Sequence, residues 1–130
     1  MHPGALHAAL RAIPGLFCVT DSTAATGMPD GEYRLGSLRV TKCMGGVRLP
    51  DGTLAGSTLT MDQALRNLVG LGLSLDDASR RVATNAADFL GLSDRGRLFV
   101  GARADVAVLD ADLQLTQVIV EGDGIDLTDV

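Results

Sequence analysis

The segment that most restricts the fold is the short apolar run Leu-Phe-Cys-Val-Thr at residues 16–20, which ends at Asp21. The run does not alternate between apolar and polar residues, which is typical of a strand buried on both faces of a parallel sheet. It follows a helix predicted over residues 3–13, which Pro14 and Gly15 would end. Because no other segment of the chain has the same character, the run lacks an evident parallel partner. The sequence therefore predicts either a small mixed sheet or one end of a longer fold.

The segments that follow predict a hairpin-like excursion and then helices. The turn motifs Met-Pro-Asp-Gly at residues 28–31 and Leu-Pro-Asp-Gly at residues 49–52 bracket a stretch that favours short strands. A capping box at Thr60 and a serine at Ser74 each predict the start of an amphipathic helix. Asn85 is expected to cap a third, short helix that Gly91 ends. A hairpin-like excursion is thus expected to precede a group of helices.

The last third of the chain has the pattern of β-strands. Strands are predicted at residues 97–100, at residues 104–110 and over residues 115–127, the last with a Gly-Asp-Gly turn. The predicted order is therefore a helix, a buried strand, the hairpin-like excursion, helices and a β-rich tail.

Composition and charge exclude several classes of function. The chain has 11 basic and 16 acidic residues and a net charge of −5, without a basic stripe or an aromatic ladder, so a nucleic-acid partner is not expected. No apolar run has membrane-spanning length and no signal peptide is evident, which favours the cytoplasm and argues against a membrane partner. Cys18 and Cys43 are too few for a disulfide framework or a zinc site, and Cys18 is expected to be a small buried side chain.

Two places in the sequence could carry chemistry, and each has a simpler interpretation. Asp21 follows an apolar run, so it is either an acid or base at the end of a strand or the cap of a turn. At Leu54-Ala-Gly-Ser57, Gly56 permits close backbone approach, and the hydroxyl-bearing residues after it precede a helix whose free N–H groups favour an acceptor. The alternative for this second segment is an ordinary loop that leads into a capped helix.

Three stretches resemble the C-terminal region of N-acetylglucosamine-6-phosphate deacetylases, which are metal-dependent members of the amidohydrolase superfamily. They read VTDSTAATGMPDGEYRLG, DGTLAGSTLTMDQALRNLV and GRLFVGARADVAVLDADL, and the resemblance extends from Met1 to about Ile125. The third stretch is general to the superfamily, whereas the first two together are specific to the family.

This resemblance implies an α/β fold in which a (β/α)8 TIM barrel is joined to a small β-sandwich built from both chain ends. Residues 1–96 would be the end of the barrel, with the active-site Asp and a substrate loop, and residues 97–130 the C-terminal strands of the sandwich. Residues 16–21 would form the eighth barrel strand, which places Asp21 at its C-terminal end, where barrel enzymes carry their chemistry.

The resemblance also implies the reaction, which is hydrolysis of the acetamide of N-acetylglucosamine 6-phosphate to glucosamine 6-phosphate and acetate in amino-sugar catabolism. A divalent metal such as zinc or iron would activate water, and Asp21 would take the proton of that water and return it to the leaving amine. Ala55, Gly56 and Ser57 carry over as substrate-binding residues. The complete enzyme would be a homodimer.

The metal ligands of such an enzyme are expected outside this chain. The chain has two histidines, His2 and His7, which do not share a helical face and which no Glu accompanies. The resemblance thus implies a C-terminal fragment that is inactive by itself. The alternatives are a non-catalytic fragment or interaction module and another deacetylase of the amidohydrolase superfamily.

Overall fold

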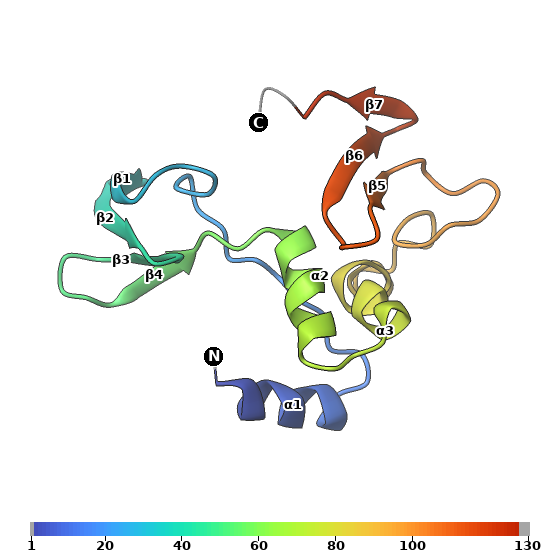
Figure 1. The fold of residues 1–130 in the computed structure, drawn as a ribbon, viewed down its shortest axis with the longest axis horizontal. Helices are drawn as coiled ribbons and strands as arrows, with labels where there is room; N and C mark the ends of the chain where they lie inside the picture. Colours follow the sequence, from blue (N-terminus) through green and yellow to red (C-terminus); the bar gives the residue numbers. More distant parts are fainter. Residues whose placement is uncertain (1, 128–130) are drawn as a thin grey trace. The chain divides into compact units, whose positions relative to one another are not determined.

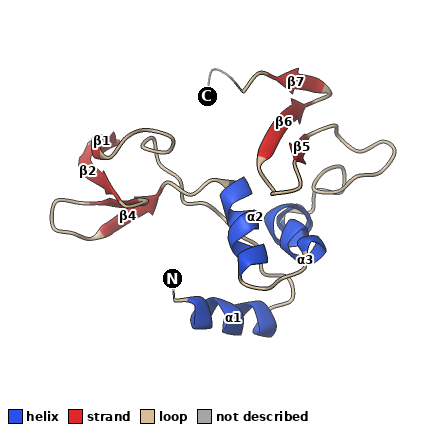
Figure 2. Ribbon diagram, viewed as in Figure 1, coloured by secondary structure: helices blue, strands red, loops and turns tan. Residues whose placement is uncertain are grey.

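The computed structural model describes residues 2–127, which divide into two compact units. One unit contains the residues up to Cys18 and those from Leu65 onward, and the other contains Val19–Ala64. Both units combine helical or irregular segments with an antiparallel sheet (Figures 1 and 2). The mixed helix and sheet content predicted from the sequence is thus confirmed.

The elements have the following bounds. The helices are α1 (Pro3–Ala12), α2 (Met61–Gly70), α3 (Leu75–Ser79), the π-helical turn η1 (Arg80–Thr84) and α4 (Asn85–Phe89). The strands are β1 (Gly31–Leu35), β2 (Leu38–Cys43), β3 (Gly46–Arg48), β4 (Leu54–Ser57), β5 (Val106–Leu109), β6 (Leu115–Val120) and β7 (Asp123–Ile125).

The unit Val19–Ala64 is built on a four-stranded antiparallel sheet in the order β1-β2-β3-β4. The predicted hairpin-like excursion is therefore confirmed, and the second turn motif closes through a hydrogen bond from the Gly52 N–H to the Leu49 carbonyl. Val40, Val47 and Ala25 form its small core. The sheet also contains β4, where the sequence predicted a loop, because residues 54–57 pair antiparallel with β3, with a register shift between Val47 and Arg48.

The other unit has a helical core to which α1 and α2 each contribute one apolar stripe. Leu10, Leu65, Leu68 and Ala78 are buried together, which confirms the predicted helical periodicity. The α1 helix ends one residue before the predicted boundary. Its first turn is capped by His2, whose Nδ1 accepts a hydrogen bond from the Gly4 N–H.

A single helical stretch runs from α3 through η1 to α4, where the sequence predicted two separate helices. The predicted start is confirmed, because the Ser74 hydroxyl accepts a hydrogen bond from the Asp77 N–H at 3.1 Å. The predicted cap at Asn85 is wrong, because its φ of −63° and ψ of −35° are helical. The Asn85 side-chain amide instead donates to the Leu16 carbonyl at 3.1 Å. Gly91, with φ of +70°, follows the end of this stretch as predicted.

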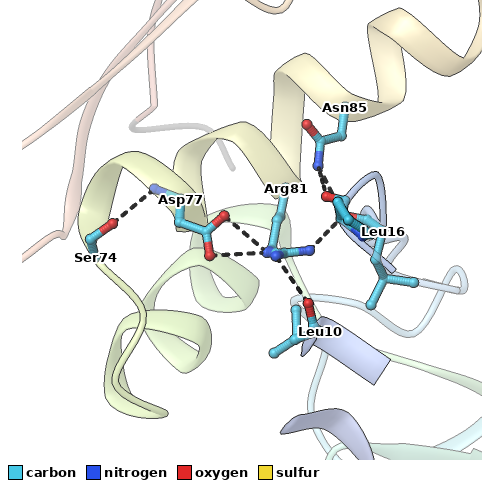
Figure 3. Close-up of polar contacts among 7 residues, drawn as sticks. Leu10, Leu16, Ser74, Asp77, Arg81 and Asn85 are labelled. Carbon is cyan, nitrogen blue, oxygen red and sulfur yellow. Dashed lines mark hydrogen bonds and ion pairs between the residues drawn. The ribbon is translucent and has the colours of Figure 1, made fainter. Parts of the chain in front are cut away.

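Arg81 lies in the π-helical turn and is a buried charged residue, with 6% of its surface exposed. Its guanidinium pairs with the Asp77 carboxylate at 3.2 Å and donates to the carbonyls of Leu16 at 3.2 Å and Leu10 at 3.4 Å (Figure 3). Its own carbonyl accepts from the Cys18 N–H. Arg81 therefore ties the end of α1 and the following segment to the helical stretch.

Residues 16–20 do not form the predicted buried strand in the described part of the chain. They join neither sheet, and Val19 is 72% exposed. The physical reason is that a strand needs hydrogen-bonding neighbours on its edges, and here the Leu16 carbonyl is bound by side chains of Arg81 and Asn85 instead.

The strand-rich tail is confirmed in two of its three predicted segments. A three-stranded antiparallel sheet in the order β5-β6-β7 covers the second and third. The first, residues 97–100, is irregular and exposes Leu98 and Val100. The β6–β7 turn falls at Glu121 and Gly122, because these two residues adopt positive φ, so the predicted turn is shifted by one residue.

Among the described residues, no helix has both the length and the apolar character needed to cross a membrane.

The two cysteines differ in their surroundings, and we expect them to differ in reactivity. Burial raises the pKa of the Cys18 thiol, against the opposing charge of Arg81, whereas Cys43 is exposed. Because the thiolate is the nucleophile, iodoacetamide near neutral pH should modify Cys43 at least about tenfold faster than Cys18. Mass spectrometry of the two peptides over time measures both rates, and the same reaction in urea is the control in which the difference should vanish. Faster modification of Cys18 in the folded chain would contradict this expectation.

Candidate functional site

The structure brings the predicted catalytic residue and the predicted substrate-binding segment into contact within one unit. The Ser57 N–H on β4 donates to the Asp21 carbonyl at 2.8 Å. A Cβ placed on Gly56 would lie 3.2 Å from the Asp21 carbonyl oxygen and 3.9 Å from its carboxylate Oδ2. Residues separated by more than thirty positions in the sequence thus form one candidate site.

Asp21 has an unusual backbone conformation for a residue that carries a side chain. Its φ of +51° lies in the left-handed region, which aspartate and asparagine tolerate better than most residues. Its side chain is exposed, so the carboxylate is accessible to a ligand or to water. The conformation and the exposure are both compatible with a functional carboxylate.

Gly56 allows the close backbone approach that its sequence context predicted. Its φ is +142°, and an added Cβ would lie 2.7 Å from the Thr23 Cγ2 atom, which is closer than real Cβ contacts. The group that approaches Gly56 is therefore the chain's own segment from Asp21 to Thr23. Contact of Gly56 with a substrate remains a prediction.

We expect Gly56→Ala to destabilise the protein. The positive φ and the contact with Thr23 each resist a side chain, so the free energy of unfolding should fall by about 1–3 kcal/mol. Gly70→Ala is the matched control, because a Cβ at Gly70 meets no atom within 4 Å and alanine favours a helix. Urea unfolding followed by circular dichroism measures both variants, and equal midpoints would contradict the expectation.

Ser57 makes more contacts with the Asp21 segment than the other two predicted substrate-binding residues. Its hydroxyl donates to the Thr20 carbonyl at 2.5 Å and accepts from the Leu59 N–H at 3.1 Å, while its carbonyl accepts from the Thr23 N–H at 3.1 Å. The Ser22 hydroxyl in turn donates to the Leu59 carbonyl. The two segments are thus joined along their length, with a parallel bridge between Ser22 and Ser57.

Ala55 has a different environment from its two neighbours on β4. Its side chain is partly buried and packs against the core of the sheet. The structure therefore places Gly56 and Ser57 against Asp21, and Ala55 against the core.

The described residues do not form a metal site. Among residues 2–127, no group of three or more His, Cys, Asp or Glu side chains is placed to hold a metal ion. His2 serves as a helix cap. The described residues thus do not supply a ligand set for the divalent metal that the resemblance implies.

The polar contacts that hold Asp21 were not predicted from the sequence. The available signal was the hydroxyl-bearing residues around it, Thr20, Ser22 and Thr23. Hydroxyls of this kind often bind backbone groups in irregular segments. Their partners on β4 and after it could not be identified without the structure.

The chain is similar to known deacetylases over most of its length. No family model matches the chain. An N-acetylglucosamine-6-phosphate deacetylase of Lysinibacillus sphaericus is 41% identical over 125 residues, which are 94% of this chain and 32% of that protein. An N-acetylgalactosamine-6-phosphate deacetylase of Escherichia coli O157:H7 is 41% identical over 106 residues, which are 80% of this chain and 28% of that protein.

A solved structure gives the same result for the fold. It is a variant of the N-acetyl-D-glucosamine-6-phosphate deacetylase of Mycobacterium smegmatis in complex with N-acetyl-D-glucosamine-6-phosphate. It superposes with a TM-score of 0.85 at 42% identity over 95% of this chain and 34% of that one. The resemblance stated from the three motifs is therefore confirmed, and the chain spans about a third of the length of the relatives it matches.

Proposed function

We propose that this chain, which is homologous over nearly its whole length to N-acetylglucosamine-6-phosphate deacetylases, is the C-terminal part of such an enzyme. The activity would be hydrolysis of the acetamide of N-acetylglucosamine 6-phosphate to glucosamine 6-phosphate and acetate. The observation that carries this proposal is the contact between Asp21 and β4, because it unites the two motifs that are specific to the family.

Asp21 would be the catalytic residue of this reaction. A water oxygen forms a bond to the acetyl carbon, and the carbon–nitrogen bond then breaks to release acetate and the sugar amine. Asp21 would accept the proton that the water loses and deliver it to the departing nitrogen. Its exposed carboxylate and the small residues around it leave space for a substrate.

Ala55, Gly56 and Ser57 were predicted from the resemblance to bind the substrate, and Gly56 lies beside the Asp21 carboxylate. Gly56 is buried against the segment from Asp21 to Thr23, so it would act on the substrate site by letting that segment lie close to β4. The ligands of the expected divalent metal would come from polypeptide outside this chain, because the described residues do not supply them.

The assignment to a barrel and a sandwich is also part of the proposal. Residues 16–20 would gain strand neighbours as the eighth barrel strand, which would cover exposed apolar side chains such as Val19. No described residue of β5, β6 or β7 is buried, which supports a missing second layer, as in a sandwich. A homodimeric enzyme in the cytoplasm would complete the proposal, on the resemblance alone.

A fusion tests the proposal directly. This chain would be fused, as the C-terminal part, to a polypeptide that corresponds to the other two thirds of the Lysinibacillus sphaericus relative. The fusion product is the joined enzyme. Acetate release from N-acetylglucosamine 6-phosphate is measured, with N-acetylgalactosamine 6-phosphate as the competing substrate because one relative is named for it.

We expect the joined enzyme to release acetate and each separate part to release none. A folded joined enzyme without activity on either sugar would refute the proposal and favour a non-catalytic module. A preference for the galactosamine compound would instead identify another deacetylase of the superfamily.

A further inference from the structure

Ser57 binds the backbone on both sides of the proposed catalytic residue. Its hydroxyl donates to the Thr20 carbonyl at 2.5 Å, and its N–H donates to the Asp21 carbonyl at 2.8 Å. Two successive carbonyls of the Asp21 segment are therefore oriented by one residue.

This arrangement matters because Asp21 has a backbone conformation that needs support. A φ of +51° is sparsely populated by residues other than glycine and persists only when the surroundings hold it. The backbone conformation at Asp21 also sets the direction of its Cα–Cβ bond, and hence the position of its carboxylate.

The Ser57 hydroxyl has little capacity left for a substrate. A hydroxyl has one donor, and here that donor is used by the Thr20 carbonyl. The same oxygen accepts from the Leu59 N–H at 3.1 Å, which fixes its position from a second side.

We infer that Ser57 is a positioning residue that holds the Asp21 carboxylate in place, and that it is not a substrate-binding residue. This inference rests on the proposed function of Asp21. The Thr23 N–H, which donates to the Ser57 carbonyl at 3.1 Å, supports it from the other side of Asp21.

The first test measures amide hydrogen exchange by NMR in the 130-residue chain and needs no activity. Ser57→Ala removes the hydroxyl and retains the N–H, so the amides of residue 57 and Leu59 should exchange at least about tenfold faster than in the parent. Thr58→Ala is the matched control, because the Thr58 hydroxyl donates to the Gly45 carbonyl and not to the Asp21 segment. Its effect on these two amides should stay within about threefold. An unprotected residue 57 amide in the parent, or equal exchange in both variants, would overturn the inference.

The second test measures kinetics in the joined enzyme. A displaced catalytic group lowers turnover, so Ser57→Ala should reduce kcat by about 10- to 100-fold while KM stays within about twofold. Ser57→Thr keeps the hydroxyl and should restore most of the lost kcat, and Thr58→Ala should retain both constants. A raised KM with unchanged kcat in Ser57→Ala would show direct substrate binding and overturn the inference. If the parent joined enzyme is inactive, the proposed function fails, while the exchange measurement still decides whether Ser57 holds Asp21.

Discussion

Asp21→Asn is expected to reduce the turnover of the joined enzyme by ~10²–10⁴-fold, the range typical of lost proton transfer by a side chain. Asparagine has the size and shape of aspartate, but it cannot take a proton from water and return it to an amine. Asp21→Asn should change the free energy of unfolding only slightly. Asp21 adopts a left-handed conformation, which asparagine tolerates as well as aspartate does, and the Asp21 carbonyl still accepts the Ser57 N–H.

The control for this substitution is Asp51→Asn in the same unit. The Asp51 carboxylate accepts the Thr53 N–H at 2.9 Å in a surface turn, a contact that asparagine can also make. We expect normal turnover and normal stability from this control. Near-normal deacetylation by Asp21→Asn would end the catalytic assignment, and Asp21 would then be only a turn residue.

Arg81→Leu is expected to cause the largest loss of stability, about 2–4 kcal/mol in the free energy of unfolding. Leucine keeps much of the apolar contact of the buried side chain but donates no hydrogen bond. The carbonyls of Leu10 and Leu16 lose a charged donor, and the Asp77 carboxylate loses its partner (Figure 3). An unmet acceptor in a partly buried position costs more than a typical hydrogen bond contributes.

Two further variants separate this network from a general effect of charge removal. Arg80→Leu changes the same residue type at the neighbouring, exposed position, and it should alter stability by less than about 0.5 kcal/mol. Arg81→Lys keeps the charge. Because a lysine ammonium cannot reproduce the planar guanidinium that binds Asp77, Leu10 and Leu16, we expect Arg81→Lys to retain only part of the parent stability. Urea midpoints compared at one protein concentration measure all three. Equal midpoints for Arg81→Leu and Arg80→Leu would show that the network contributes little.

Local sequence signals determined much of the helical structure and the first sheet. The Ser74 cap and the stripe through Leu65 and Leu68 depend only on residues within one or two turns of each other. The turn motif that ends at Gly52 acts over four residues. Caps, helical stripes and turns are predictable because the residues that interact in them lie close together in the sequence.

The sequence indicated candidate residues for the site but not the contacts between them. The sequence, through its resemblance to a family, indicated Asp21 and the segment Ala55, Gly56 and Ser57. The bond from the Ser57 N–H to the Asp21 carbonyl joins two segments that are far apart in the chain. The close approach of Thr23 that requires glycine at residue 56 joins the same two segments. No pattern within either segment specifies such a pairing.

The tertiary structure alone decided how the polar groups between α1 and the helical stretch are satisfied. The run at residues 16–20 has the composition of a buried strand, yet a strand exists only where neighbouring strands supply its hydrogen bonds. In this chain the Leu16 carbonyl is bound by Arg81 and Asn85, which also makes Asn85 a donor within a helix where a cap was predicted. The sequence by itself thus determined the elements that are held together by near neighbours. The partners of Leu16, Asp21 and Arg81 were decided by the tertiary structure, because a hydrogen bond depends on distance and direction in space and not on separation along the chain.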